Sequence, residues 1–365
     1  MKVPTQSDVA KKVGVSRATV SYVLSGRSGG NISVTEQTRQ SVLHVAKELG
    51  YESNASAVSL RLKKTRNLGI VLLSVNNPHM LQILCGATQA AVQNDYNMLV
   101  FYSEMRPDVE KLGIRELLRG QIDGLILIPT YAPNLKDELD LLSKQRRPVA
   151  ITTNNYYSFA ELDSVTPGHD LGANELMTYL LQLGHRSIAL VKHAAYKPLG
   201  QERLDAYQNG LQSAGIAIQA DLIVETGSTD QDGYEAGMQL LERHPRPTAI
   251  VALTDVLALG VCRAIVASGL RIPEDISVAG FDNNDYTAYL NPPLTTVNVN
   301  ALDIGAQAVQ LVLERIARPE RPFQHRRIAH QLIVRGSTGA APRQFAQPNL
   351  ENKSLVPEKG GYAIR

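Results

Sequence analysis

The sequence predicts an all-α helix-turn-helix head followed by an α/β body of two doubly wound parallel sheets. At 365 residues the chain is longer than a single hydrophobic core usually accommodates. Closely spaced helix caps occupy its start, and short apolar runs alternate with helix-length amphipathic segments over most of the rest. These patterns predict a head (1–52), a hinge helix with its linker (53–66), a body (67–338) and a disordered tail (339–365) that has mixed charge and no periodicity.

The composition is that of an ordinary globular protein, with 44% hydrophobic and 20% charged residues. The sequence contains no apolar run of the roughly 18 residues that a membrane span needs, and its start has no apolar segment of the kind that directs secretion. We therefore expect a cytoplasmic protein. Cys85 and Cys262 lie far apart in apolar surroundings, which favours buried reduced thiols over a disulfide or a nucleophile.

Charge is distributed unevenly along the chain. Residues 1–66 hold eleven Lys and Arg against four Asp and Glu, whereas residues 67–365 hold 26 against 31. A basic head on a mildly acidic body is typical of a head that binds a polyanion. If charge is the only observation considered, an ordinary solvated surface explains the basic head equally well.

The first two helices of the head are predicted from their caps. Thr5 and Asp8 have capping-box spacing, so a helix is expected from about Gln6. Gly14 ends that helix, and Ser16 caps a second one only two residues later. Two short helices joined by a turn of this length predict a helix-turn-helix.

The second helix has two faces when its residues are placed on a helical wheel. Its apolar face consists of Thr19, Val20, Val23 and Leu24, and its outward face of Arg17, Ala18, Ser21 and Tyr22. The outward face suits a DNA major groove, because Arg bonds guanine and the methyl group of Ala contacts that of thymine. The hydroxyls of Ser16, Thr19 and Ser21 suit phosphate contacts. An ordinary solvent-facing helix gives the same wheel.

A third helix is expected over residues 36–49, between a Thr35 cap and a Gly50 stop. The hinge segment that follows has room for a helix of about eight residues, which is marginal in water unless something packs against it. Its best neighbours are the same helix of a second copy and a DNA groove.

The body contains eight candidate strands, separated by segments of helical periodicity. These strands are residues 68–73, 98–101, 124–128, 149–152, 188–191, 222–224, 249–253 and 276–281. Ligands of parallel α/β sheets bind at the carboxyl ends of the strands. The polar residues in those positions are Asn76, Asn77, Thr153, Asn154, Thr254, Asp255 and Asp282.

Several motifs occur in order along the chain. They are the run Ser7-Asp8-Val9-Ala10-Lys11-Lys12-Val13-Gly14-Val15-Ser16-Arg17-Ala18-Thr19-Val20-Ser21-Tyr22-Val23-Leu24, the body segments Leu183-Gly184-His185-Arg186 and Thr254-Asp255, and the segment Ile272-Pro273-Glu274-Asp275-Ile276-Ser277-Val278-Ala279-Gly280-Phe281-Asp282. Together these motifs resemble the lactose-repressor (LacI/GalR) family of bacterial transcription regulators. The resemblance covers about residues 5–338. It implies a regulator, in most members a repressor, that binds a near-palindromic operator as a homodimer. The body it implies has two periplasmic-binding-protein-like lobes with a small-molecule effector, such as a sugar or sugar derivative, in the cleft between them.

The resemblance assigns roles in the head residue by residue. The base-reading positions are Arg17, Ala18 and Tyr22. The positions that mostly contact phosphate are Thr5, Ser16, Thr19 and Ser21. Leu60 matches the hinge residue that wedges into the minor groove, with the small Ala57 beside it. The segment 26–33 is longer than usual, and Ser53 and Val58 depart from the hinge pattern.

In the body, Arg203 matches the arginine that grips the ligand, and Asp282 the aspartate that accepts sugar hydroxyls. The remaining effector-binding candidates are Asn77, Thr153 and Thr254. This sequence departs from the family at His79-Met80, at Gly168-His169, at Thr153-Asn154 and at Thr254. The effector is therefore not assigned to a common sugar or purine, and control by a partner protein is an alternative. Tyrosines that offer a stacking platform instead are Tyr131, Tyr156, Tyr157, Tyr196 and Tyr286.

Two other classes of protein compete with a regulator, namely an enzyme and a transport-type solute-binding protein. The histidines have no metal-ligand spacing, and no Walker loop, dinucleotide fingerprint or nucleophile elbow is present, so neither an enzyme nor a cofactor or metal site is expected. A transport-type solute-binding protein fits the body alone. It has no use for residues 5–62 and needs a signal peptide.

Overall fold

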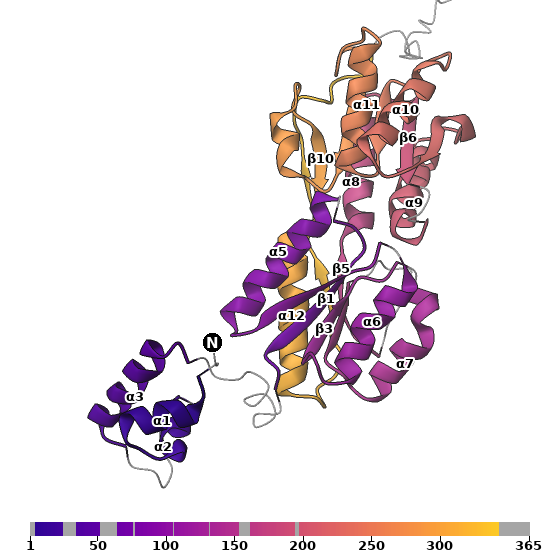
Figure 1. Cartoon of the computed structure of the whole chain (residues 1–365). Helices are drawn as coiled ribbons and strands as arrows, with labels where there is room; N and C mark the ends of the chain where they lie inside the picture. The colour runs from indigo at the N-terminus through magenta and orange to yellow at the C-terminus, as the bar shows by residue number, and fades with distance from the viewer. Residues whose placement is uncertain are drawn as a thin grey trace, which may run out of the picture.

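The computed structural model describes residues 4–24, 34–51, 64–75, 77–104, 106–130, 132–152, 161–193 and 197–342. The head consists of α1 (Gln6–Val13), α2 (Arg17–Leu24) and α3 (Glu36–Glu48). The body consists of two α/β lobes, each built on a sheet of six strands (Figure 1). The predicted order of an all-α head and a doubly wound body is confirmed.

The caps of the head helices agree with the sequence pattern. The Thr5 backbone N–H donates to Asp8 Oδ2 at 2.8 Å, and the Asp8 N–H donates to Thr5 Oγ1 at 3.3 Å, which completes a capping box. Gly14 ends α1 with φ of 77°, a conformation that an L residue rarely adopts. The three helices share one small core, made of Val9, Ala10, Val20, Val23, Val42 and Ala46.

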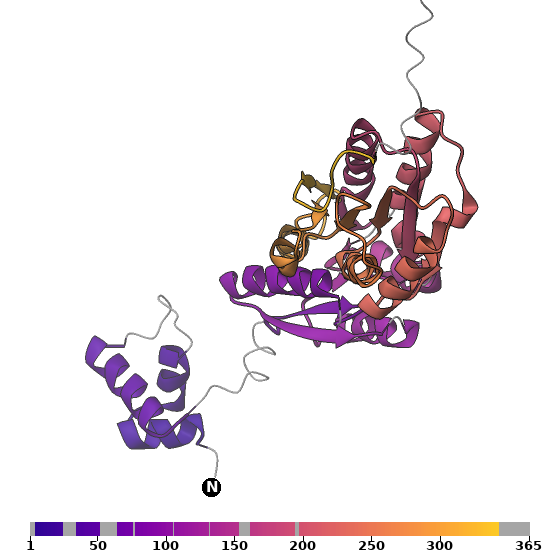
Figure 2. The ribbon, with the colours of Figure 1, turned by 90° about the horizontal axis from the view of Figure 1, so that it is seen from above.

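The N-lobe has a parallel sheet in the strand order β11-β5-β4-β3-β1-β2. Its strands are β1 (Asn67–Leu72), β2 (Asn97–Tyr102), β3 (Gly124–Leu127), β4 (Val149–Thr152), β5 (Asp163–Pro167) and β11 (His325–Ile328). One face is covered by α5 (Pro78–Gln93) and α12 (Ala301–Ala317), and the other by α6 (Pro107–Leu118) and α7 (Lys136–Lys144), which follows the short η1 (Ala132–Leu135). Figure 2 shows purple α5 beside golden α12 over the N-lobe strands.

The C-lobe repeats this plan in the order β12-β10-β9-β8-β6-β7, with β12 antiparallel to β10. Its strands are β6 (Ile188–His193), β7 (Ile223–Thr226), β8 (Ala249–Ala252), β9 (Ser277–Phe281), β10 (Thr295–Asn298) and β12 (Gln331–Ile333). One face is covered by α8 (His169–Gln182) and α9 (Lys197–Ser213), the other by α10 (Asp230–Leu241) and α11 (Asp255–Ala267). The short helices η2 (Ala220–Leu222) and η3 (Asp285–Tyr289) lie in its loops.

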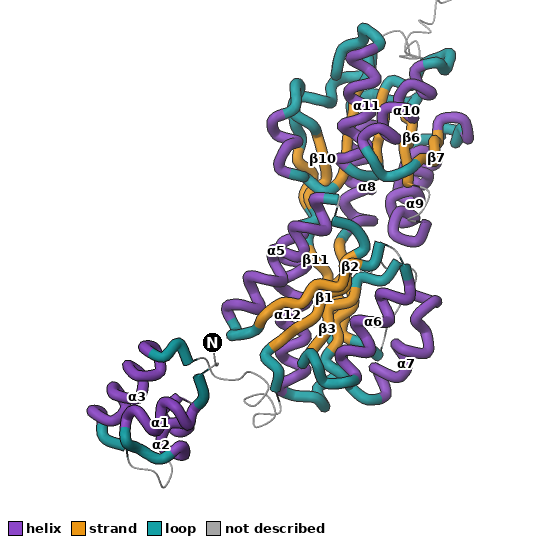
Figure 3. Tube along the Cα trace, viewed as in Figure 1, coloured by secondary structure: helices purple, strands orange, loops and turns teal. Residues whose placement is uncertain are grey.

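The chain crosses between the lobes from β5 to α8, from β10 to α12 and from β11 to β12 (Figure 3). α12 and β11 return to the N-lobe after most of the C-lobe has been formed, and the third crossing leads back to the C-lobe strand β12. All eight predicted strands are present as β1–β4 and β6–β9. The prediction missed β5, β10, β11 and β12.

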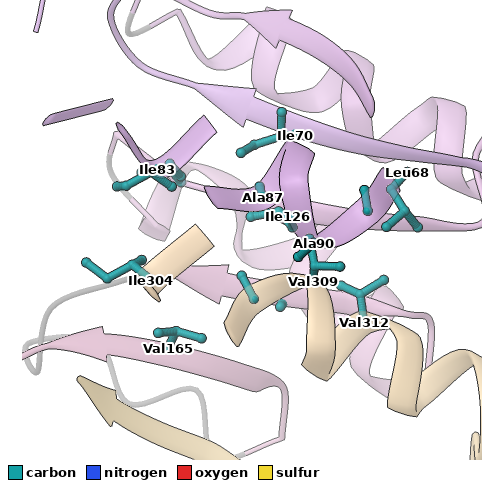
Figure 4. Close-up of a cluster of buried hydrophobic side chains, with 14 of the residues drawn as sticks. Leu68, Ile70, Ile83, Ala87, Ala90, Ile126, Val165, Ile304, Val309 and Val312 are labelled. Carbon is teal, nitrogen blue, oxygen red and sulfur yellow. The ribbon is translucent and has the colours of Figure 1, made fainter. Parts of the chain in front are cut away.

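The N-lobe helices α5 and α12 approach each other closely enough that their backbones touch. A Cβ on Gly86 would lie 1.9 Å from the Leu302 carbonyl oxygen, and a Cβ on Gly305 would lie 2.0 Å from that of Ile83. Only glycine fits at these two positions. Helices α5 and α12 therefore form one layer, which packs against the N-lobe sheet through a shared apolar core (Figure 4).

The expectation of two buried thiols is wrong for Cys85, which lies on the outer side of α5 and is exposed. Cys262 on α11 is half-buried, and burial raises the pKa of its thiol to about 12. Both cysteines are free, so neither forms a disulfide. Within the described part of the chain, every helix is too short or too polar to cross a bilayer.

The last described residues are attached to the C-lobe. Gly339, where the sequence prediction begins its tail, donates its N–H to Ser277 Oγ at 3.1 Å, and the Ala341 N–H donates to the Leu183 carbonyl at 2.9 Å. His185 links this segment to the C-lobe, because its two ring nitrogens form hydrogen bonds with Thr248 Oγ1 and with the Gly339 carbonyl. Residues 343–365, the hinge residues 52–63 and the insertion at 26–33 lie outside the described residues.

Candidate functional site

The head presents the outward face of α2 as the sequence predicts. Arg17 and Ala18 are exposed and Tyr22 is half-buried, whereas Val20 and Val23 are buried against α1 and α3. The packing of the apolar side fixes which residues face outward, because a helix has only one face left once the other is buried.

The hydroxyls predicted to contact phosphate also cap helices. Ser16 Oγ accepts from the Thr19 N–H at 3.0 Å and lies 2.9 Å from Thr19 Oγ1, and Thr5 caps α1. Ser16 and Thr5 remain exposed, so each retains acceptor capacity at a helix N-terminus, where an anion is favoured. Ser21 is half-buried on the next turn. The predicted hinge residues Ala57 and Leu60 lie outside the described residues.

A cavity of about 80 Å³ lies between the two lobes. The residues that line it are Asn77, His79, Met80, His169, His193, Gly200, Arg203, Leu253, Thr254 and Asp282. Four of the five effector-binding candidates from the sequence are therefore brought together, although they come from loops after three different strands and from α9. The fifth, Thr153, lies outside the described residues, and Tyr286 does not line the cavity.

Arg203 is the central cation of the cavity and is only 8% exposed. Its Nη1 donates to the Leu253 carbonyl, and its Nη2 donates to His169 Nδ1 at 2.9 Å. The guanidinium also lies 4.7 Å from the centre of the Phe281 ring, which adds a cation–π contact. Burial lowers the pKa of Arg203, although an arginine in a protein stays charged at neutral pH.

Asp282 is the acceptor that faces Arg203. Its Oδ1 lies 3.7 Å from Arg203 Nη2 and 3.8 Å from His79 Nδ1, too far for good hydrogen bonds, and its Oδ2 has no hydrogen-bond partner among the described residues. Burial raises the pKa of this carboxyl. The backbone φ of 104° lies in the left-handed region, a strained conformation of the kind that clusters at binding sites.

Asn77 and Thr254 line the cavity while capping helices. Asn77 Oδ1 accepts from the His79 N–H at 3.0 Å at the start of α5, and Thr254 Oγ1 accepts from the Leu257 N–H at 3.2 Å at the start of α11. Asp255, also a cleft candidate from the sequence, does not line the cavity. It is buried and accepts hydrogen bonds from Thr296 Oγ1 at 2.6 Å and from the Asn284 N–H at 2.8 Å.

Sequence reasoning missed the three histidines of the cavity: it noted His79 and His169 only as departures from a family pattern and did not place His193 there. All three stand at the end of a strand or within the first turn of a helix that follows one. Burial lowers the pKa of His79, and burial with the nearby Arg203 holds the pKa of His169 well below its usual value. No cluster of three or more metal-ligating side chains occurs among the described residues.

Comparison with known proteins identifies both parts of the chain. Residues 5–54 match the family described as bacterial regulatory proteins, lacI family, and residues 177–338 match a periplasmic binding protein-like domain. The ribose operon repressor of Haemophilus influenzae is 30% identical over 324 residues, which cover 88% of this chain and 94% of that protein. The chain belongs to the lacI family of bacterial regulatory proteins. Catabolite control protein A of Priestia megaterium is 31% identical over 333 residues, 91% of this chain and 98% of that one.

Solved structures extend the similarity to the whole fold of this lacI-family chain. The lac repressor dimer bound to operator and the anti-inducer ONPF matches with a TM-score of 0.82 at 27% identity, covering 93% of this chain and 100% of that one. A lacI-family regulator from Enterococcus faecium with bound ribose matches with a TM-score of 0.65 at 26% identity, covering 75% of this chain and 99% of that one. The two-lobed effector-binding fold expected from the sequence is thereby confirmed.

Proposed function

We propose that this lacI-family protein is a transcription repressor that binds a near-palindromic operator as a homodimer and is controlled by a small molecule held between its lobes. It would act on DNA in the cytoplasm and has no catalytic role. The observation that carries the proposal is the outward face of α2, where exposed Arg17 and Ala18 stand on a helix fixed by its buried valines. The relatives named as repressors and the operator-bound lac repressor support it.

Selection from a random pool of DNA duplexes tests this function directly. The full chain at physiological ionic strength should enrich one near-palindromic sequence with two half-sites, because each head of a dimer reads one half. Recovery of random duplexes only, with no enrichment over repeated rounds, would exclude sequence-specific regulation.

Arg17→Ala is expected to lower affinity for the selected operator by roughly 1–3 kcal/mol and to relax the preference at one base pair of each half-site. The reason is that Arg17 is exposed and free to form a bidentate bond with a guanine edge. A gel-shift series with single-base operator variants measures both effects. As a control, Lys47→Ala removes one positive charge from an exposed position on α3 and should weaken binding slightly, and equally for all DNA sequences. Unchanged base preference in Arg17→Ala contradicts the base-reading role.

A homodimer is supported by the exposed apolar side chains of α5 and of the edge strand β2. These are Leu81, Val92, Leu99, Val100 and Tyr102, each between 37% and 63% exposed. An edge strand with exposed apolar side chains is open to a further partner. Sedimentation of the full chain should give twice the monomer mass. A monomer at micromolar concentration contradicts this part of the proposal.

Control from the cleft requires that the body hold the end of the hinge firmly, and Asp123 does so. Its Oδ1 accepts from the Thr65 N–H at 2.8 Å and from Thr65 Oγ1 at 2.9 Å, and its Oδ2 accepts from the Arg66 N–H at 3.0 Å. The Arg66 guanidinium lies 5.3 Å from the centre of the Tyr96 ring. The residues where the hinge segment meets the N-lobe are therefore attached to the loop before β3.

Asp123→Ala is expected to weaken operator binding by about three- to tenfold, since it removes several hydrogen bonds worth about 0.5–1.5 kcal/mol each and part of that loss reaches the hinge. Gel shifts on the selected operator measure the loss, and thermal unfolding checks that the body stays folded. As a control, Asp140→Ala breaks an exposed ion pair with Lys136 on α7 and should change neither the operator affinity nor the thermal unfolding of the body. Full operator affinity in a folded Asp123→Ala protein shows that this attachment does not matter to the head.

A further inference from the structure

The cavity between the lobes is surrounded by the N-terminal ends of long helices. Asn77 caps the 16-residue α5, His169 is the first residue of the 14-residue α8, and Thr254 caps the 13-residue α11. The N-cap residue of α8 is Gly168, which has no side chain to accept from the first N–H groups of the helix. Helix N-termini carry partial positive charge and favour anions.

The ionisable side chains of the cavity are mostly bases. Among the described residues that line it, Arg203, His79, His169 and His193 are the bases and Asp282 is the one carboxylate. Several buried polar atoms on the residues that line the cavity have no hydrogen-bond partner among the described residues, and they include His79 Nδ1, Arg203 Nε and Asp282 Oδ2. These three residues are 6%, 8% and 2% exposed. Leaving such atoms unpaired is costly, so a ligand that pairs with all three gains affinity.

His169 is an acceptor for Arg203 in this arrangement. Arg203 Nη2 lies 2.9 Å from Nδ1 and 3.4 Å from Nε2 of His169, and because a guanidinium only donates, the imidazole that accepts from it is neutral. An anion that enters the cavity can replace His169 as the acceptor for Arg203. The released imidazole can then take up a proton and donate to the same anion.

We propose that the ligand of this cavity is a small hydroxy acid, whose carboxylate accepts from Arg203, His79 and His169 while a hydroxyl donates to Asp282 Oδ2. This inference rests on the proposed function, since it names the chemical class of its effector. A neutral polyol can engage Arg203 and Asp282 but leaves the two imidazoles without an anion.

Binding of such an acid is coupled to proton uptake. Burial holds the pKa of His79 and His169 below the usual value, so both are neutral near pH 7. A bound carboxylate raises the pKa of a neighbouring imidazole and also that of the Asp282 carboxyl. Each of these groups therefore tends to take up a proton when the acid binds, and the affinity for the acid rises as pH falls. The charged groups that act on the two imidazoles are Arg203 on α9 and Asp282 after β9, and His193 on β6 lines the same cavity. Glu202 on α9 and Asp255 at the start of α11 act on Arg203.

Matched pairs of an acid and its alcohol test the proposal on the full chain. D-Glycerate with glycerol, D-ribonate with ribitol, and D-gluconate with D-glucitol differ within each pair only in a carboxylate against a hydroxymethyl group. In titration calorimetry we expect the best acid to bind at least about tenfold more tightly than its alcohol, with the ratio larger at about pH 6 than at about pH 8. Equal or tighter binding of the alcohol overturns the proposal, as does failure of all three acids to bind at millimolar concentration.

His169→Asn should reduce the preference for the acid by roughly tenfold and remove most of its pH dependence. His325→Asn, an exposed substitution of the same kind on β11, should leave both unchanged. If His169→Asn does not fold, as judged by thermal unfolding, His79→Gln takes its place. An acid preference that survives in the folded variant contradicts the role of the imidazoles. Operator binding by the wild type, measured separately, shows whether the proposed function itself holds.

Discussion

Replacing Asp163 with Ala is expected to lower the free energy of unfolding of the body by about 3–5 kcal/mol. Asp163 is buried on β5, where it accepts from Arg315 Nε at 3.0 Å, from Arg315 Nη2 at 3.2 Å and from the Gln324 N–H at 2.9 Å. Arg321 Nη2 lies 3.0 Å from the same carboxylate. Without it, two buried guanidinium groups lose their common counter-ion, which costs far more than a lost surface pair.

The urea midpoint of the full chain measures this effect. Glu320→Ala, which removes a carboxylate that is 86% exposed and pairs with Arg146, should change the free energy of unfolding by no more than about 1 kcal/mol. Asp163 joins β5, which precedes the C-lobe in sequence, to α12 and to the segment before β11, which follow the first five strands of the C-lobe. If Asp163→Ala unfolds at the wild-type midpoint, the buried charges do not hold the N-lobe together.

The strands that the sequence predicts are those that contain a run of apolar residues, whether that run is buried, as in β1, β3 and β8, or largely exposed at the sheet edge, as in β2. The strands that it does not predict carry polar residues whose partners are distant in sequence. On β5, Asp163 resembles a loop residue until Arg315 is brought beside it, and on β10 the buried Thr295 bonds to Ser337 and Thr338. Local periodicity contains no information about such bonds.

The cleft also contains some residues that the sequence identifies and others that only the folded structure brings to attention. Arg203 and Asp282 are found from the sequence because each stands in a recognisable motif, and the structure places them 3.7 Å apart. His79 and His169 become functional candidates only when the two lobes meet, since His79 belongs to an N-lobe helix and His169 begins a C-lobe helix. Their burial and lowered pKa values arise from that meeting and not from their neighbours in sequence.

The size of the cavity bears on how a ligand acts. About 80 Å³ is well below the roughly 300–1,000 Å³ of pockets that enclose drug-sized molecules. A sugar-sized ligand therefore has to change the angle between the lobes or displace side chains around Arg203. Such a change, transmitted through the crossings and the N-lobe to Asp123, is a hinge motion of the kind by which ligands shift two-state proteins.

Asp282→Asn is expected to abolish the change in operator affinity caused by the tightest-binding member of the three acid and alcohol pairs, and to weaken binding of that ligand by about tenfold to a hundredfold. The physical reason is that Asp282 Oδ2 is a buried acceptor with no partner in the described part of the chain, and a charged acceptor bonds to a ligand hydroxyl about twice as strongly as a neutral amide oxygen does. Gel shifts with increasing ligand measure the change in operator affinity, and calorimetry measures the affinity for the ligand. Asp285→Asn, an exposed change three residues away on η3, is the matched control.

Comparison of two substitutions then separates the roles of the cavity's groups. Asp282→Asn should weaken the alcohol at least as much as the acid, because both present a hydroxyl to Oδ2 and the substitution also removes a negative charge that repels the carboxylate of the acid, whereas His169→Asn should weaken only the acid. An Asp282→Asn protein that keeps the wild-type dose response, with operator binding intact, removes Asp282 from the ligand site. A variant that loses the response to the acid but not to the alcohol would instead show that Asp282 acts through the imidazoles, by way of His79 Nδ1 at 3.8 Å, and not on the ligand hydroxyl.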